Sequence, residues 1–146
     1  MIRPAQASDR EAVEAIVQAA YSIYIGRIGK PPGPMLDDYG RLIAEGRVSV
    51  AEEGGAVSAV IVLLPQPDHL LLDNIAVRPD RQGQGLGRKL VAFADGEARR
   101  LGFREVRLYT HQKMTENIAL YLRLGFVETG RGAQDGYDRV FMAKRL

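Results

Sequence analysis

The most informative pattern of apolar and polar positions lies between Leu70 and Leu101. An apolar run at Leu70–Val77 predicts a buried strand, and the glycine-dense stretch Gln82–Gly87 predicts a turn. Behind the turn, apolar residues recur every three or four positions, which predicts an amphipathic helix with one buried face. These residues are Leu86, Leu90, Ala94, Ala98 and Leu101. The pattern therefore predicts a strand, a glycine-rich turn and a helix in direct succession.

The segment before Leu70 alternates between helical and strand patterns. A capping-box spacing at Ser8–Glu11 predicts the start of a helix, and the prolines and glycines near residue 31 predict a loop. We expect a strand at Ile2–Ala5, a helix from Ser8 to Tyr24, a loop at Gly26–Pro34, a helix at Met35–Gly46 and hairpin strands at Arg47–Glu53 and Ala56–Leu64.

The segment after Leu101 adds one helix and three strands. We expect a strand at Glu105–Thr110, a helix at Thr115–Arg123 and a closing antiparallel pair at Val127–Arg131 and Tyr137–Lys144, joined by a turn at Gly132–Gly136. The order of elements is typical of a mixed α/β protein. Because no repeat, linker or low-complexity tract interrupts it, residues 1–146 are predicted to form a single domain.

The composition of the chain argues against several classes of function and of site. The formal net charge is +2, and the Arg and Lys residues are dispersed, so nucleic-acid binding is not indicated. There is no cysteine, which excludes disulfides, thiolate metal ligands and an acyl-cysteine intermediate. The N-terminus has no signal-peptide pattern, and no apolar run reaches about 18 residues, so we expect a cytoplasmic protein without a membrane span.

The glycine-rich turn has the chemistry of a phosphate site. The first turn of a helix has unpaired N–H groups, and Gly83, Gly85 and Gly87 let an anion approach them closely. Arg88 and Lys89 add positive charge. No Ser or Thr follows Lys89, which excludes a Walker loop, and position 88 is not the glycine that a dinucleotide fingerprint requires.

The spacing that remains, Gln-x-x-Gly-x-Gly at Gln82, Gly85 and Gly87, follows Ile-Ala-Val-Arg-Pro and resembles the acyl-CoA pyrophosphate loop of the GCN5-related N-acetyltransferases (GNAT). A second segment, Thr115–Phe126, also resembles this family and places Asn117 and Tyr121 on one helix face. The resemblance extends over nearly the whole chain. It implies a single-domain GNAT fold, with a mixed central sheet of about seven strands flanked by about four helices.

The resemblance further implies transfer of the acetyl group of acetyl-CoA to a primary amine, by direct attack in a ternary complex and without a metal. Backbone groups of Ile75, Ala76 and Val77 would then hold the acetyl and pantetheine end. Asn117 would help to hold the cofactor arm, and Tyr121 stands at the family position of the acid that protonates the leaving thiolate. The pyrophosphate would be bound by Gln82, Gly83, Gln84, Gly85, Leu86, Gly87 and Arg88.

A base is also needed, because keeping an alkyl amine neutral at pH 7 costs roughly 4–5 kcal/mol. Asp73, just before the acetyl-binding residues, is the first candidate, and Glu116 and His111 are weaker ones. Several of the candidate residues also have a purely structural interpretation. Asp73 could be a strand-end residue bonded to a loop, and Tyr121 could be a core tyrosine. Asn117 could be a helix N-cap, and His111 could be a loop histidine.

The acyl acceptor is not specified by the sequence; it is a small-molecule amine or a protein amino group. Tyr21, Tyr24 and Tyr39 are expected to be core aromatics, although with Arg27 and Lys30 they would suit an acceptor that carries a carboxylate. A non-catalytic acyl-CoA-binding sensor is the alternative function. A homodimer is compatible with the sequence, but no stretch requires one.

Overall fold

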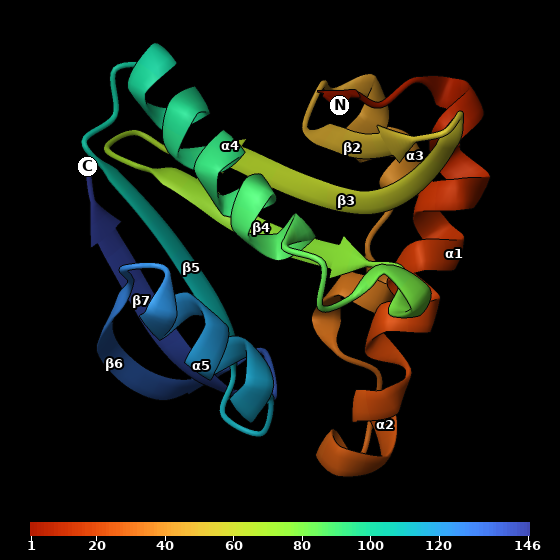
Figure 1. Cartoon of the computed structure of the whole chain (residues 1–146). Helices are drawn as coiled ribbons and strands as arrows, with labels where there is room; N and C mark the ends of the chain where they lie inside the picture. The colour runs from red at the N-terminus through yellow and green to blue at the C-terminus, as the bar shows by residue number, and fades with distance from the viewer. The chain divides into compact units, whose positions relative to one another are not determined.

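The computed structural model describes all residues from Met1 to Leu146. Seven strands form one mixed sheet in the order β1-β2-β3-β4-β5-β7-β6, which confirms the predicted fold class (Figure 1). Strands β4 and β5 pair in parallel, and β7 pairs antiparallel with both β5 and β6. The strands are β1 (Ile2–Pro4), β2 (Val48–Glu53), β3 (Ala56–Pro65), β4 (Leu70–Val77), β5 (Glu105–His111), β6 (Val127–Gln134) and β7 (Tyr137–Arg145).

Five α-helices accompany the strands: α1 (Arg10–Tyr21), α2 (Ile23–Ile28), α3 (Tyr39–Ala44), α4 (Leu86–Arg100) and α5 (Thr115–Arg123). Short 3₁₀ turns lie at Ala7–Asp9, Gly33–Leu36 and Pro79–Arg81. The longest helix, α4, has 15 residues, and none of the five combines the length and apolar character needed to cross a membrane.

The chain contacts itself in two compact units. The first comprises Met1–Leu63 and Asn74–Leu90, and the second comprises Leu64–Asp73 and Val91–Leu146. The chain passes from one unit to the other near the end of β3, within β4 and again within α4. That residues 1–146 form a single domain therefore stays a prediction, and each unit is described by itself.

In the first unit, β1, β2 and β3 pair antiparallel, with Ile2 opposite Ala51 and Val50 opposite Val60. The turn from β2 to β3 uses Gly54 and Gly55, whose φ angles of 59° and 82° are the positive values that a tight hairpin turn favours. The predicted hairpin is confirmed. Its core consists of α1 and strand residues without exposed surface, among them Val13, Val17, Val50, Val60, Ile61 and Val62.

The N-terminal helix boundaries differ from the prediction. Gly26, expected in a loop, is helical within α2, and the helix ends instead at Gly29, whose φ of 91° is left-handed. The second helix begins at Tyr39 rather than Met35, because the Asp38 side chain accepts a hydrogen bond from the Arg41 N–H at 3.1 Å and caps it there. Apolar spacing alone thus placed the start of this helix too early.

The capping box predicted at Ser8–Glu11 is wrong. Asp9 takes that role, because its Oδ2 accepts the Gln6 backbone N–H at 2.7 Å. Asp9 also accepts hydrogen bonds from both terminal nitrogens of Arg3, whose Nε donates to Glu52 at 2.6 Å. The start of α1 is therefore fixed by an ion pair with β1 as well as by the local sequence.

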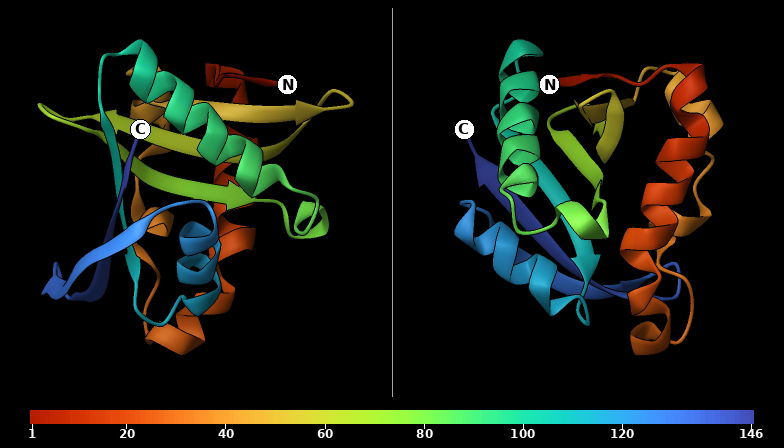
Figure 2. Two further views of the ribbon diagram at one scale, coloured as in Figure 1. Left: turned by 60° about the vertical axis from the view of Figure 1, so that its left-hand side comes forward. Right: turned by 45° about the vertical axis from the view of Figure 1, so that its right-hand side comes forward.

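In the second unit, β7 lies between β5 and β6, and α5 packs beside β6 (Figure 2). The turn from β6 to β7 contains only Asp135 and Gly136, both with positive φ, so β6 continues through the turn predicted at Gly132–Gly136. Alternate strand residues form the core, while those next to them lie on the opposite face. The core residues include Leu70, Leu72, Val106, Leu108, Val140 and Met142.

Candidate active site

The glycine-rich loop joins β4 to α4 in the first unit. Arg78, directly after β4, donates its backbone N–H to the Ser58 carbonyl of β3 at 2.9 Å, which anchors the strand end. After the 3₁₀ turn at Pro79–Arg81, the Gln82 side-chain amide donates to the Val77 carbonyl at 3.2 Å. The loop is thus folded back on the end of the strand that precedes it.

The geometry of this loop fits an anion. Gly83 and Gly85 have φ angles of 81° and 83°, a conformation that L side chains rarely adopt. The first hydrogen bond of α4 runs from the Lys89 N–H to the Gly85 carbonyl, at 3.1 Å. The N–H groups of Leu86, Gly87 and Arg88 therefore have no acceptor within the helix. The stretch from Gln82 to Gly85 is exposed, as are Arg88 and Lys89. A solvent-facing helix N-terminus with adjacent cations suits a pyrophosphate.

Asn74, in the middle of β4, is a residue that the sequence analysis missed. Its side chain is buried; its Oδ1 accepts from the Tyr21 hydroxyl at 2.6 Å, and its Nδ2 donates to the Tyr39 hydroxyl at 2.7 Å. The Tyr21 hydroxyl also lies 2.8 Å from the Ile75 carbonyl, and that of Tyr39 donates to the Pro34 carbonyl at 2.6 Å. The sequence did contain a signal for this network, namely an asparagine within an apolar strand. A buried side-chain amide needs hydrogen-bond partners, so its position predicts polar neighbours.

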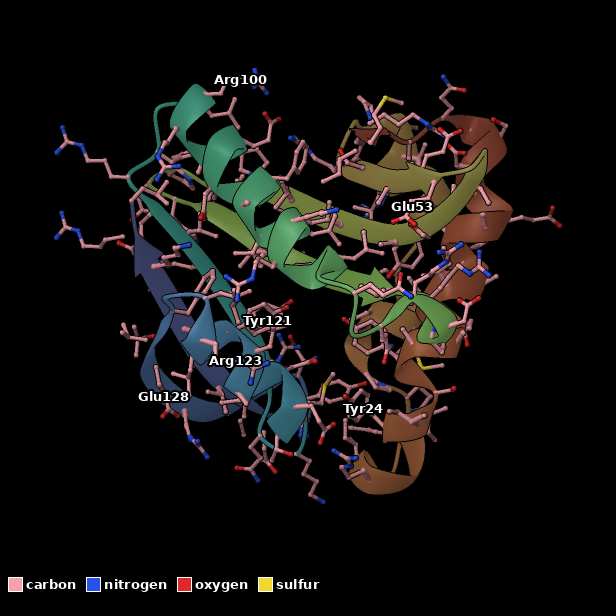
Figure 3. The ribbon with its side chains drawn as sticks, viewed as in Figure 1. Tyr24, Glu53, Arg100, Tyr121, Arg123 and Glu128 are labelled. Carbon is pink, nitrogen blue, oxygen red and sulfur yellow. The ribbon has the colours of Figure 1, made fainter.

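This network identifies Tyr21 and Tyr39 as core tyrosines with bonded hydroxyls, as expected. Tyr24, the third tyrosine of the region, is also buried and lies on α2, where it is labelled in Figure 3. The guanidinium carbon of Arg27 stands 5.0 Å from the centre of its ring. Arg27 thus makes a cation–π contact with Tyr24.

Asp73, the candidate base, lies on β4 within the second unit. The Tyr109 hydroxyl of β5 donates to its Oδ1 at 3.2 Å, so its partner is a strand residue and not the neighbouring loop that the structural interpretation expected. Burial raises the pKa of Asp73, against the opposing effects of this hydrogen bond and of the charge on Arg139. Leu70 and Leu71 pair with β5, and no pair follows at Leu72 or Asp73.

Tyr121, the candidate acid, is buried on α5 (Figure 3). Its ring meets Phe126 edge to face, with 5.6 Å from centre to centre, and its hydroxyl makes no hydrogen bond within the chain. Burial alone raises the pKa of Tyr121 well above its ordinary value of 10.0. The phenol therefore keeps its proton near neutral pH and has it available for a ligand.

Asn117 lies on α5 one turn before Tyr121. Its backbone N–H donates to the Met114 carbonyl at 3.1 Å, and Met114 is the N-cap of the helix. The interpretation of Asn117 as the N-cap is therefore wrong. Its side chain shares a helix face with Tyr121, as the spacing predicted.

The weaker base candidates are placed as follows. His111 is not in a loop but is the buried last residue of β5, and its Nδ1 accepts the Lys113 N–H at 3.1 Å. The hydrogen of the neutral ring then resides on Nε2, which leaves that nitrogen no lone pair for a substrate proton. Glu116 is exposed and accepts from the Thr115 hydroxyl at 2.9 Å. No three His, Asp or Glu side chains gather as a metal site would require.

Sequence comparison decides the family. The sequence pattern of the acetyltransferase (GNAT) family matches residues 13–126, which include both motif segments. The chain belongs to the GNAT family. This confirms the resemblance described from the two motifs. N-acetyltransferase family 8 member 2 of Rattus norvegicus is 34% identical over 111 residues, which cover 72% of this chain and 46% of the relative. The chain spans less than half the length of the first curated relatives it matches.

Solved structures agree with this GNAT assignment. The PaiA N-acetyltransferase of Thermoplasma acidophilum, in complex with coenzyme A, matches with a TM-score of 0.84 at 17% identity, over 100% of this chain and 98% of that one. YncA of Salmonella typhimurium, with its cofactor acetyl-CoA, matches with a TM-score of 0.76 at 26% identity, over 99% and 92%. These matches confirm the predicted fold.

Proposed function

We propose that this GNAT chain transfers the acetyl group of acetyl-CoA to a primary amine by direct attack in a ternary complex. The observation that carries the proposal is the loop before α4. Two glycines with positive φ lie in an exposed stretch that leads into a 15-residue helix with unpaired first N–H groups, beside the exposed Arg88 and Lys89. Family membership and the acetyl-CoA bound by a structural relative support the identity of the anion.

Acetyl-CoA would be held by two neighbouring parts of the first unit. The loop from Gln82 to Arg88 offers backbone N–H groups to the pyrophosphate, and charge-assisted hydrogen bonds from the two cations would add to them. Ile75, Ala76 and Val77 would supply backbone groups to the acetyl and pantetheine end. The orientation of the Ile75 peptide is already fixed by the Tyr21 hydroxyl, 2.8 Å from its carbonyl oxygen.

The chemical roles fall on residues of the second unit. Asp73 accepts a proton from the amine, whose nitrogen forms a bond to the acetyl carbon as the carbon–sulfur bond breaks. Tyr121 donates its proton to the departing sulfur, and Asn117 helps to hold the cofactor arm. The raised pKa of Asp73 brings the base closer to the operating pH, and the raised pKa of Tyr121 keeps the acid protonated.

The test is release of free CoA from acetyl-CoA, followed with a thiol reagent across amines, amino acids and peptides. The chain contains no cysteine and adds no background signal. Amine-dependent release supports the enzyme. Binding of acetyl-CoA without release on any amine favours the non-catalytic sensor, and absence of binding contradicts both functions. Gly85→Val provides the control, because a β-branched residue at a φ of 83° should distort the loop and abolish binding.

A further inference from the structure

One face of β5 and β7, within the second unit, carries a cluster that the proposed reaction does not yet explain. Tyr109 stands opposite Phe141 in the strand register, and His111 stands opposite Arg139. Because side chains alternate along a strand, Tyr137, Arg139 and Phe141 project from one face of β7. The His111 ring meets Tyr137 edge to face, 6.2 Å from centre to centre. Asp73 joins this cluster through the Tyr109 hydroxyl.

Arg139 is the charged centre of the cluster. Only 11% of its side chain is exposed, and its guanidinium carbon stands 4.0 Å from the centre of the Tyr109 ring and 5.7 Å from that of Tyr137. Stacking on aromatic faces leaves the N–H edge of a guanidinium available for hydrogen bonds in its own plane. The nearest carboxylate oxygen, on Asp135, is 3.8 Å away, which exceeds hydrogen-bond distance, and the Asp135 side chain is 78% exposed.

Arg139 is largely covered yet makes no hydrogen bond to a carboxylate, which is unusual because removing a charge from water is costly unless it is closely paired. Arg107, on the same face of β5, shows the ordinary arrangement: its Nε donates to Glu105 at 2.6 Å, and a terminal nitrogen lies 3.6 Å from Asp68. Arg139 has only the longer ion pair with Asp135 at 3.8 Å, besides its interactions with Tyr109 and with the charge of Asp73. Its planar fork matches the geometry of a carboxylate bound through two oxygens.

We propose that Arg139 binds the carboxylate of the acyl acceptor, so that the acceptor is an amine that also carries a carboxylate, such as an amino acid. The inference rests on the proposed function and names the substrate class of the same site. Arg139 and Asp73 both contact Tyr109, one over its ring and the other at its hydroxyl. A carboxylate held by Arg139 would therefore bring the acceptor beside Tyr109, the residue that also contacts the base Asp73.

The experiment compares matched acceptors that differ only in the carboxylate. L-amino acids with small, aromatic and cationic side chains are each paired with the corresponding amide, and kcat/KM is measured by CoA release. The wild-type protein should prefer the best acid over its amide by at least about 30-fold, as expected for a buried charge pair. Arg139→Gln should remove this preference by lowering the rate on the acid far more than the rate on the amide. Arg139→Lys, which keeps the charge without the planar fork, should fall in between.

Arg107→Gln is the matched control, since it removes an arginine from the same face whose charge is already paired. The Arg107→Gln variant should keep the wild-type preference for the acid over its amide. Equal use of acids and amides by the wild type, or an equal loss on both in Arg139→Gln with the fold intact by circular dichroism, overturns the inference.

Binding provides a readout that does not need turnover. With CoA present, calorimetry should show N-acetylated amino acids binding more tightly than N-acetylated amino-acid amides, and Arg139→Gln should abolish the difference. Absence of the difference in the wild type overturns the inference. Transfer only to amines without a carboxylate overturns it too while the proposed function stands. Carboxylate binding that depends on Arg139, without transfer to any amine, leaves the carboxylate site standing and overturns the proposed function.

Discussion

Two buried tyrosines, one in each unit, show how differently the same side chain is used. Tyr21 is 6% exposed and Tyr121 is 7% exposed, so burial does not distinguish them. The Tyr21 hydroxyl lies 2.6 Å from the Asn74 Oδ1 and 2.8 Å from the Ile75 carbonyl, whereas the Tyr121 hydroxyl has no partner within the chain. The first is part of the structure that holds β4, and the second is available for chemistry.

The comparison extends to the surroundings of each ring. Tyr21, Asn74 and Tyr39 connect α1, β4 and α3 in the unit that carries the phosphate loop. The Tyr121 ring meets Phe126 edge to face, in the unit that carries Asp73. We therefore expect changes in the first region to affect stability and cofactor binding, and changes in the second to affect turnover.

The largest effect should come from Tyr121→Phe. Loss of the acid should lower kcat by about 100-fold or more, the usual contribution of general acid catalysis. Because the hydroxyl makes no hydrogen bond in the chain, the free energy of unfolding should change by less than about 0.5 kcal/mol. Steady-state kinetics and urea unfolding measure the two. An unchanged kcat with the best acceptor would remove Tyr121 from the acid role.

Asn74→Ala should lower the stability of the protein, which Tyr121→Phe leaves nearly unchanged. The change leaves the buried hydroxyls of Tyr21 and Tyr39 without their amide partner, and the free energy of unfolding should fall by about 2–3 kcal/mol in urea. Tyr21→Phe should cost about 1 kcal/mol, because it removes one hydroxyl and keeps the ring. If Tyr21→Phe is as stable as Tyr121→Phe, the contrast between the two tyrosines is wrong.

Gly85→Ala separates binding from turnover. A Cβ at this position meets no atom within 4 Å, so the cost of about 1–2 kcal/mol arises from the φ of 83° alone. The affinity for CoA should weaken about tenfold in calorimetry, with kcat at saturation little changed. Gly96→Ala, on α4 with equal space and no positive φ, is the matched control and should bind normally. Equal affinities in the two variants would contradict the assigned loop geometry.

Asp73→Asn should alter the pH profile. The rate of the wild type should rise with pH as Asp73 loses its proton, with the midpoint above the ordinary value of 3.8 because burial raises the pKa. The variant should lack this limb. Burial makes the ionised Asp73 carboxylate unfavourable in the folded state. The free energy of unfolding should therefore increase as the pH falls through the raised pKa of Asp73 toward 3.8, the ordinary value of the unfolded chain. An unaltered rate profile would assign the base to another group.

Local rules account for the elements that the sequence predicted well. The strand Leu70–Val77, the loop and the helices that begin at Leu86 and Thr115 stand where the pattern placed them, because periodicity and glycines determine such elements within a few residues. The start of α1 was misplaced because the carboxylate of Asp9 caps the turn before the helix, where it accepts from the Gln6 N–H and from Arg3 of β1.

The residues of the candidate site also divide into those that the sequence located and those that only the folded structure reveals. Motif spacing located the phosphate loop and Tyr121. It could not reveal that Asn74 bonds residues 53 and 35 positions away, since such pairs exist only in the folded chain. Nor could it identify Arg139, because the chain has many arginines and only packing shows which one is largely covered and stacked on aromatic rings.

The most direct test of the central claim is to follow a carbon-13 acetyl label from acetyl-CoA onto the acceptor by NMR. The account predicts that the label appears in an amide bond to the amine nitrogen, in equal amount with the free CoA that is released. Recovery of the label in acetyl-CoA alone, from a protein that binds the cofactor and has been offered every acceptor class, would contradict it.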